Sequence, residues 1–208
     1  MRNIKIIDNF LNKEDLCSLL NQLKNKKTRN FKILHNTIDS RNKIIDSAIE
    51  KKLIYRLQKR YFPKASKILK KLSPKKLQLY NFSDFTIIIT NKNKKFPIHD
   101  DTPDKILSGV VYLYPKNNSG TIFYSNKKGE NKKKIKWKIN RAVFFSRLEK
   151  QTWHSYQGNG KSDRIALVFN LKTKNIKKVF EIEKKNFILG YLRYKLNPYL
   201  FKFFKYTI

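Results

Sequence analysis

The sequence contains little cysteine and no long apolar run. Its 208 residues include a single cysteine, Cys17, so no disulfide can form within the chain, which fits a reducing cytoplasm. The longest apolar runs, FTIIIT and GVVYLY, are too short to cross a bilayer. The opening residues, MRNIKIIDNF, carry no signal-peptide pattern. We therefore expect a cytoplasmic protein without a transmembrane segment, with Cys17 as a buried structural thiol.

Acidic residues are also scarce. Fifteen Asp and Glu residues stand against 48 Lys and Arg residues, which gives a net charge of +33. Such a charge attracts polyanions. The lysines, however, are spread along the whole chain among many Asn and Ile residues, all of which have A/T-rich codons, so biased base composition is an equally good source of the charge. The charge alone predicts nonspecific affinity for nucleic acid and no particular chemistry.

What is present is enough apolar and aromatic sequence to form a core, at 40% and 13% of the residues. The pattern predicts a strand at Ile4–Ile7 and a helix capped near Asn12. A second apolar stripe at helical spacing runs from Ile44 to Leu57 and ends before Pro63, and a further helical segment stops at Pro74. From residue 75 onward, short β-branched and aromatic runs alternate with Asn, Lys and Gly turns. This order indicates an α+β chain whose second half is a sandwich or barrel.

We expect one domain over residues 1–208, built in three parts. Residues 1–74 supply a strand and supporting helices, and residues 75–172 form the β core. Residues 173–208 form an aromatic and basic extension that is helical before Pro198. This extension has three possible roles, namely packing on its own domain, meeting another subunit or touching a membrane surface, and we favour the first.

Two of the three histidines flank the β region. In a strand, residues i and i+2 point to the same face, so His99 and Asp101 in FPIHDD aim an imidazole and a carboxylate into one space. Asp100 would point away, to solvent or to a supporting contact. His154, which begins a later strand, would complete a set of two histidines and one carboxylate. That set suits non-haem Fe(II) and leaves coordination positions open.

Arg164 opens the apolar strand RIALVF, ten residues after His154. A buried arginine needs an anionic partner, because an unpaired buried charge is costly. A dicarboxylate cosubstrate would supply one, since the planar guanidinium can grip its distal carboxylate through two hydrogen bonds.

These residues resemble the 2-oxoglutarate- and Fe(II)-dependent dioxygenases, in particular the branch similar to prolyl 4-hydroxylases. The resemblance runs from IKIIDNFLNKEDLCSLL through HDD, SGVVYLYP, GTIFY, NRAVFFS and WHSY to Arg164. It implies a double-stranded β-helix (jelly-roll, cupin-like) core with the N-terminal helices packed on one face. It also implies that His99, Asp101 and His154 bind iron, that Arg164 anchors 2-oxoglutarate, and that Tyr112 contacts the same carboxylate.

The implied reaction consumes 2-oxoglutarate and O2 and releases succinate and CO2. Because Asp101 leaves no vacancy for a halide, hydroxylation is favoured over halogenation. The substrate stays open between a protein side chain and a small metabolite. A demethylase of alkylated nucleic acid is disfavoured, because that branch has a second arginine where Asn170 stands.

Two alternatives remain. One is a basic nucleic-acid- or surface-binding jelly-roll protein whose metal site is inactive. The other is a cupin-like protein with a different divalent metal, which Arg164 disfavours.

Overall fold

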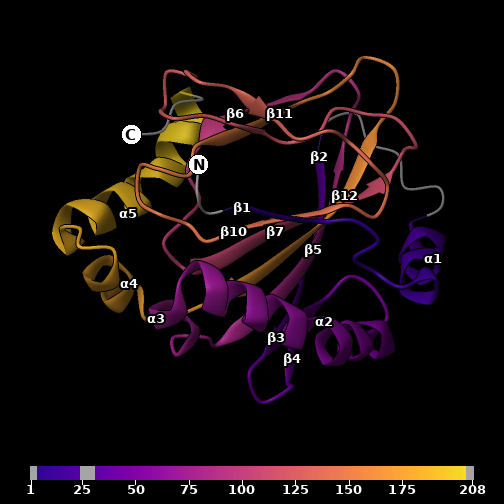
Figure 1. The fold of residues 1–208 in the computed structure, drawn as a ribbon, viewed down its shortest axis with the longest axis horizontal. Helices are drawn as coiled ribbons and strands as arrows, with labels where there is room; N and C mark the ends of the chain where they lie inside the picture. Colours follow the sequence, from indigo (N-terminus) through magenta and orange to yellow (C-terminus); the bar gives the residue numbers. More distant parts are fainter. Residues whose placement is uncertain (1–3, 24–30, 205–208) are drawn as a thin grey trace.

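The computed structural model describes residues 4–23 and 31–204 of the chain. Figure 1 shows two sheets facing each other, with helices along the outside of the larger one. The helices are α1 (Lys13–Gln22), α2 (Lys51–Leu72), α3 (Pro74–Leu77), α4 (Ile176–Ile182) and α5 (Phe187–Phe204). The strands are β1 (Ile4–Ile7), β2 (Phe31–Leu34), β3 (Asn36–Asp39), β4 (Ile44–Ser47), β5 (Phe82–Thr90), β6 (Lys95–His99), β7 (Lys105–Tyr114), β8 (Ile122–Phe123), β9 (Lys133–Lys134), β10 (Ala142–Phe145), β11 (His154–Gln157) and β12 (Arg164–Lys172). Among these residues, no helix combines the length and the apolar character needed to cross a membrane.

The larger sheet has eight strands in the order β1-β10-β7-β12-β5-β3-β4, with β2 also paired to β5. The smaller sheet has four strands in the order β6-β11-β8-β9. Every strand pairing in the described part of the chain is antiparallel. The α+β class predicted from the sequence is therefore confirmed, with helices at both ends of a chain that is otherwise antiparallel sheet.

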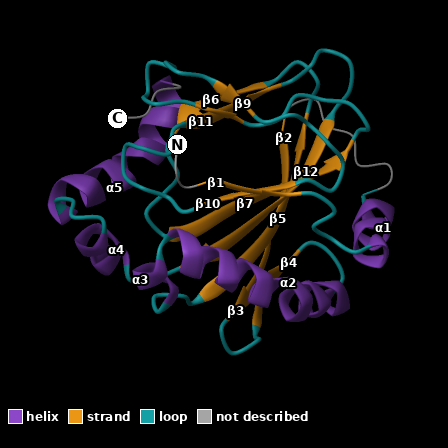
Figure 2. Ribbon diagram, in the orientation of Figure 1, coloured by secondary structure: helices purple, strands orange, loops and turns teal. Residues whose placement is uncertain are grey.

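Both faces of the large sheet are apolar, and other elements of the protein cover each of them. Alternate residues of β5, such as Phe85 and Ile87, are fully buried in a core that includes Leu57 and Tyr61 of α2. Figure 2 shows α2 and α3 along one face of this sheet and the small sheet over the other. A second apolar cluster, made of residues from both sheets and the loops between them, fills the space between the sheets: Tyr112, Phe123, Ile135, Trp137, Val143 and Phe145.

The first helix forms as the sequence predicts, except at its cysteine. Asn12 caps α1, because its side-chain oxygen accepts a hydrogen bond from the Asp15 N–H at 2.8 Å. Leu19 is fully buried on the inner face of the helix. Cys17, which we expected to be buried, is exposed, because it lies on the opposite side of the helix from that face.

The helix predicted from Ile44 onward is wrong over its first residues. Ile44–Ser47 form β4, an outer strand paired with β3, and α2 begins only at Lys51. Between the two strands, Asp39 Oδ1 accepts hydrogen bonds at 2.9 and 2.8 Å from two backbone N–H groups of the turn that follows it. This turn holds the segment against the sheet, so pairing with β3 overrides its helical spacing.

Two prolines lie inside helices that we expected them to end. Helix α2 continues through Pro63 to Leu72, and α5 continues through Pro198 to Phe204. Pro63 is exposed, whereas Tyr61 and Ala65 on either side of it are buried. The apolar face that α2 packs on the sheet thus outweighs the backbone hydrogen bond that the proline removes.

The C-terminal helices pack on the edge of the same core. Phe180 of α4 is fully buried and contacts Phe187 of α5 edge to face, with ring centroids 6.1 Å apart. Gly190 permits this packing, because a Cβ added there would lie 2.2 Å from the Phe180 ring. In Figure 1, α5 runs from α4 to the end of the small sheet, where β6 and β11 lie. One side of the C-terminal extension thus packs on its own domain.

Candidate metal centre

The three predicted metal ligands meet at the end of the small sheet. His99 is the last residue of β6 and His154 the first of β11, and the two are direct partners across the antiparallel pair. Their ring centroids are 4.2 Å apart. Asp101 joins them, so that one potential ligand atom of each residue lies within 4.8 Å of the others. Residues distant in the sequence therefore form one compact donor set of two imidazoles and a carboxylate.

Both imidazoles are held in the same way by the backbone. The Nδ1 atom of His99 donates to the carbonyl oxygen of Pro97 at 3.0 Å, and that of His154 donates to the carbonyl of Thr152 at 2.9 Å. A carbonyl oxygen can only accept, so each ring carries its proton on Nδ1. The Nε2 atom of each ring is therefore left with a lone pair, which is the form that binds a metal.

Asp101 lies just beyond the end of β6, in a turn, although we expected it within the strand. Its carboxylate is fixed by two hydrogen bonds, from Lys105 Nζ to Oδ1 at 2.6 Å and from Ser108 Oγ to Oδ2 at 2.6 Å. Each carboxylate oxygen keeps a further lone pair, so these bonds orient the group without exhausting it. The carboxylate reaches the two imidazoles because β7 holds it, not because it alternates along a strand.

The electrostatics of the cluster favour the protonation states that bind a cation. Burial lowers the pKa of His99 to about 3, helped by the neighbouring imidazole, and burial also lowers the pKa of His154. For Asp101, burial opposes ionisation, but the Lys105 ammonium and the two imidazoles outweigh it and lower its pKa. Neutral imidazoles beside an ionised carboxylate are the donor set that a divalent transition metal requires.

Aromatic rings border the histidines. Phe96 lies 4.6 Å from His99, and Phe145 lies 4.9 Å from His154, both measured between ring centroids and both edge to face. Phe123 lies next to Phe145, with its ring centroid 5.8 Å from that of His154. These rings keep bulk water from one side of the cluster.

Arg164 is a buried cation without an acidic partner among the described residues. It is the first residue of β12, its exposed fraction is 7%, and its Nε atom has no hydrogen-bond partner. Three aromatic rings surround its guanidinium: Tyr156 at 4.0 Å, Trp137 at 5.6 Å and Tyr112 at 5.7 Å. Burial lowers the pKa of this guanidinium. Cation–π contacts offset only part of the cost of burying the charge, so the site favours an anion.

Tyr112 is buried beside Arg164, stacked on Trp137 with ring centroids 4.4 Å apart. Its hydroxyl accepts a hydrogen bond from the Thr121 N–H at 2.8 Å and donates to Thr121 Oγ1 at 3.0 Å. The neighbouring turn is tight, because a Cβ on Gly120 would lie 1.9 Å from the Ile135 carbonyl oxygen. Tyr112 therefore forms part of the wall around Arg164.

A cavity of about 220 Å³ opens directly beside the metal cluster. Its floor includes His99 and Asp101, and its opposite wall is α5, through Gly190, Arg193 and Tyr194. The remaining lining combines apolar residues with polar and charged ones: Phe96, Pro97, Pro103, Trp153 and Pro198, and Asp100, Thr102, Arg147, Glu149, Lys150 and Asn197. A small molecule or a single side chain could therefore lie next to the metal ligands, between the small sheet and the C-terminal helix.

No protein-family model and no curated protein matches this sequence. Solved structures, in contrast, resemble its fold. A prolyl-4-hydroxylase from Pseudomonas putida superposes with a TM-score of 0.56 at 12% identity, over 83% of this chain and 94% of that one. A 2OG-Fe(II) oxygenase family oxidoreductase from Burkholderia pseudomallei gives 0.57 at 12% identity, over 82% and 84%. The chain has the fold of the 2OG-Fe(II) oxygenases.

A third structure of this fold is a prolyl hydroxylase from Trichoplax adhaerens, in complex with a peptide fragment of the hypoxia inducible factor oxygen degradation domain. It superposes with a TM-score of 0.54 at 15% identity, over 86% of this chain and 87% of that one. The likeness therefore extends over most of both chains in all three cases and does not depend on sequence similarity.

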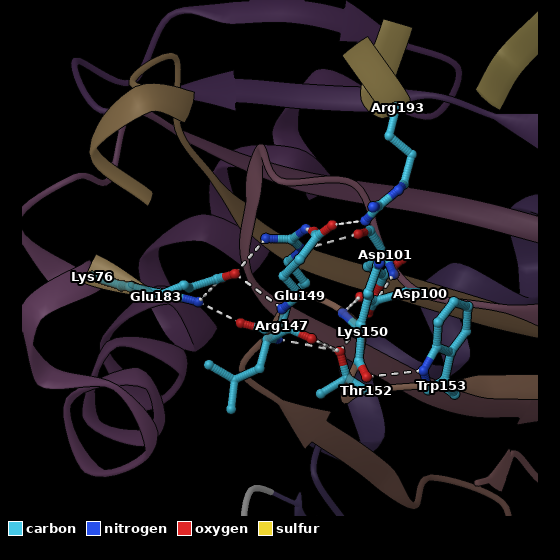
Figure 3. A network of polar contacts seen from close by, with 11 residues as sticks. Lys76, Asp100, Asp101, Arg147, Glu149, Lys150, Thr152, Trp153, Glu183 and Arg193 are labelled. Atoms are coloured by element: carbon cyan, nitrogen blue, oxygen red, sulfur yellow. Dashed lines mark hydrogen bonds and ion pairs between the residues drawn. The ribbon is translucent and has the colours of Figure 1, made fainter. Parts of the chain in front are cut away.

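In this 2OG-Fe(II) oxygenase fold, a buried polar network lies next to the His99–Asp101–His154 cluster and contacts the backbone of Asp101. It consists of Lys76, Arg147, Glu149, Glu183 and Arg193 (Figure 3). Glu183 is its centre, accepting from Lys76 Nζ at 2.7 Å and from Arg147 Nη1 at 2.7 Å. Arg147 Nε also donates to the backbone oxygen of Asp101 at 3.1 Å. The network thus connects α3 and the C-terminal extension to the turn that carries the carboxylate.

Asp100 belongs to this supporting structure and does not face open solvent. It accepts hydrogen bonds from Thr152 Oγ1 at 2.6 Å and from the Lys150 N–H at 2.7 Å. Burial raises its pKa to about 6. Of the two roles that the sequence left open for this residue, the structure shows the supporting contact, which ties the end of β6 to the loop before His154.

Several residues of the site were not identified from the sequence. Tyr156 had a usable signal, because it lies two residues after His154 and therefore on the same strand face. Ser108 and Lys105 had none, since their role depends on how β7 lies against the turn after β6. Asn170, by contrast, makes a structural contact, donating from Nδ2 to Asp84 Oδ2 at 3.2 Å.

Proposed function

We propose that this protein is a 2-oxoglutarate- and Fe(II)-dependent dioxygenase that hydroxylates a protein side chain or a small metabolite and releases succinate and CO2. We further infer that the two facing sheets are the two halves of a double-stranded β-helix. The observation that carries the proposal is a buried His99–Asp101–His154 cluster in the same fold as a buried arginine that lacks an acidic partner. A metal site alone would not need that arginine.

The residues fit the metal by their chemistry. His99 and His154 would bind Fe(II) through Nε2, because Nδ1 of each ring is engaged by a carbonyl, and Asp101 would bind through one carboxylate oxygen. When bound, Fe(II) would supply the oxygen-activating chemistry that couples oxidative decarboxylation of 2-oxoglutarate to insertion of one oxygen atom into the substrate. Lys105 and Ser108 would hold Asp101 in place, because each donates to one of its oxygens.

Arg164 would bind the far carboxylate of 2-oxoglutarate. Its unpartnered Nε and its planar guanidinium can donate two parallel hydrogen bonds to such a group, and burial would make each stronger. Tyr156 would hold the guanidinium in position through the contact of its ring with the guanidinium face. Tyr112 stays the predicted second contact to the same carboxylate, and to donate to it the hydroxyl would have to release Thr121 Oγ1.

The primary substrate would occupy the cavity between the cluster and α5. Its volume of about 220 Å³ holds an amino-acid side chain or a small metabolite, not a whole folded partner. The apolar part of the lining would exclude water from the reacting centre. Arg193 and Tyr194 of α5 would contact the part of the substrate that faces away from the metal.

A spectroscopic experiment tests the proposal. Chelator-treated protein is mixed anaerobically with Fe(II) and 2-oxoglutarate, and the visible charge-transfer band of the chelate is recorded. Wild type should show the band and should form succinate when air is admitted, whereas His99→Ala should do neither. His35→Ala is the matched control, because His35 is exposed and lies outside the site.

The opposite result is equally clear. If wild type gives neither the band nor succinate, the enzyme assignment is wrong. Strong, salt-dependent binding of polyanions together with that result would favour the alternative of a basic binding protein with an inactive metal site.

A further inference from the structure

The outward side of α5 carries a stripe of exposed apolar residues. The α5 stripe consists of Leu189, Leu192, Leu196 and Tyr199, with exposed fractions of 63%, 52%, 48% and 64%. Their spacing alternates between three and four residues, which places them on one side of a helix. Isolated apolar residues on a surface are ordinary, but four along one helical side form a continuous patch.

The other side of α5 is already used by the protein. Gly190 is buried against Phe180, and Arg193 and Tyr194 line the cavity beside the metal cluster. One side of the helix is therefore packed, while the α5 stripe on the other side is exposed. A contiguous exposed apolar patch usually marks an interaction site. The α5 stripe therefore needs a contact that the described part of the chain does not provide.

Basic residues border the stripe. Leu189, Leu192 and Leu196 line an open groove together with Arg193 of the same helix and with Lys127, Lys150 and Trp153 from two separate loops. None of the described residues that line this groove is acidic. Helix α5 itself contains arginine and lysine but no aspartate or glutamate. Lys127, Lys150 and the exposed Lys195 add positive charge at this surface, beside Arg193, which is paired with Glu149.

The combination of exposed leucines and nearby lysines restricts which kind of molecule can bind at this surface. A second copy of the chain could cover the apolar residues, but each copy carries a net charge of +33 and would place lysines against lysines. A nucleic acid would match the lysines but would leave three leucines in contact with phosphates and water. A bilayer of anionic phospholipids satisfies both, because the acyl region takes the leucines and the headgroups take the lysines.

We propose that α5 docks on an anionic phospholipid membrane, lying in the plane of the interface with the α5 stripe turned toward the acyl chains. Tyr199, which has an apolar ring and a polar tip, suits the headgroup level. The orientation is parallel to the surface, in keeping with the finding that no described helix can span a bilayer. The proposal is independent of the reaction proposed above, because it rests on the outward side of α5 and on the lysines beside it.

Vesicle flotation tests it. The full-length protein is mixed with vesicles of phosphatidylcholine alone or of phosphatidylcholine with phosphatidylglycerol. It should float with the anionic vesicles and stay behind with the neutral ones. Leu192→Gln/Leu196→Gln should lower the partition coefficient by at least about tenfold, because each leucine then loses its transfer into the acyl region.

The matched control changes as many exposed apolar residues elsewhere. Ile33→Gln/Ile45→Gln alters side chains that are 50% and 52% exposed on β2 and β4, and it should bind anionic vesicles as wild type does. For the charges, Lys150→Gln should weaken binding, whereas Lys67→Gln, an exposed lysine of α2, should change it less. Thermal melting of each variant verifies its fold, and Leu189→Gln provides a single substitution at the most exposed leucine of the stripe.

Three outcomes would overturn the proposal. One is failure of wild type to float with anionic vesicles. Another is equal binding by wild type and the leucine variants, which would assign the binding to net charge alone. The third is a dimer in light scattering that Leu192→Gln dissociates, which would make a second copy the occupant. Persistence of part of the binding at about 1 M salt, where charge attraction is screened, would support the apolar contact.

Discussion

His99 and His154 face each other across one antiparallel strand pair, with ring centroids 4.2 Å apart. The backbone register alone fixes this proximity, because the residues are direct Cα partners at the ends of β6 and β11. Each ring is also locked by a carbonyl two residues before it in the chain, Pro97 for one and Thr152 for the other. The placement of the two imidazoles is therefore built into the sheet and does not require a ligand to assemble it.

Substitution of Arg164 should separate cosubstrate binding from metal binding. Arg164→Met removes the proposed partner of the distal carboxylate, a charge-assisted pair worth about 3 kcal/mol, so the 2-oxoglutarate concentration for half-saturation should rise by about 100-fold. Fe(II) affinity should stay unchanged. Titration of the visible band with 2-oxoglutarate measures the first, and metal titration without 2-oxoglutarate measures the second.

The same variant should not unfold the protein. Arg164 is a buried cation with an unpartnered Nε, so an apolar residue of similar length should leave the melting temperature unchanged or raise it. Arg141→Met is the control, since Arg141 is a partly exposed arginine paired with Asp8. A large loss of stability in Arg164→Met, with unchanged 2-oxoglutarate affinity, would show that this arginine has a structural role.

Ser108 should matter for metal binding although it is not a ligand. Ser108→Ala removes the 2.6 Å hydrogen bond that orients Asp101, and Fe(II) or Co(II) affinity should fall by about 10- to 100-fold. Ser146→Ala is the matched control, because Ser146 is equally buried but donates to the carbonyl of Ile106. Metal titration by calorimetry distinguishes the two. Equal affinities in both variants would contradict a positioning role for Ser108.

Stability of the chelator-treated protein should fall in acid. Burial lowers the pKa of both ligand histidines in the folded state, that of His99 from 6.5 to about 3. Between these values the unfolded chain binds more protons than the folded one, so the free energy of unfolding decreases as the pH falls through 6.5. The slope should approach about 1.4 kcal/mol per pH unit for each histidine.

Urea unfolding at about pH 7.5 and about pH 5.5 measures this slope. The variant His99→Gln/His154→Gln should flatten it, whereas His35→Gln should leave it as in wild type. Saturating Fe(II) should steepen the loss, because protons then also displace the metal. A slope that is the same in wild type and in the double variant would show that these histidines are not the groups responsible.

Glu183, at the centre of the polar network, should contribute strongly to the stability of the folded protein. Glu183→Gln leaves the buried cations of Lys76 and Arg147 without their shared carboxylate, so the free energy of unfolding should drop by about 3–5 kcal/mol. Glu181→Gln is the control two residues away, since it removes only an exposed ion pair with Lys178, which solvent screens. Denaturant midpoints compare the two variants, and similar midpoints would contradict the assignment.

The sequence predicted the metal cluster better than the contacts that support it. His99, Asp101 and His154 could be found because histidines are rare in this chain and their spacing is local or falls at a strand start. The register between β6 and β11 then brought them together. Lys105, Ser108 and the polar network depend on long-range contacts between segments, for which a single sequence carries no local signal.

The errors in the predicted secondary structure also concern segments for which local sequence preference was not decisive. Ile44 and Ile45 fit a helical stripe, but a turn closed by Asp39 pairs them with the sheet instead. Pro63 and Pro198 should have ended their helices by local preference, yet both helices continue past them. For β4 and for α2, whose residues Ala65, Ile68 and Leu69 after Pro63 are buried, tertiary packing outweighed a local propensity of about 1–3 kcal/mol.

Gly190 affects both the cavity and the outer surface of α5, because it sets how closely this helix packs on α4. The helix can approach α4 only because no methyl group stands between its backbone and the Phe180 ring, and this approach sets where the far wall of the cavity lies. The width of the cavity thus depends on a missing atom in the wall that lies opposite the donor set. A single added carbon there would shift the helix outward, enlarging the cavity and tilting the surface that α5 presents to its surroundings.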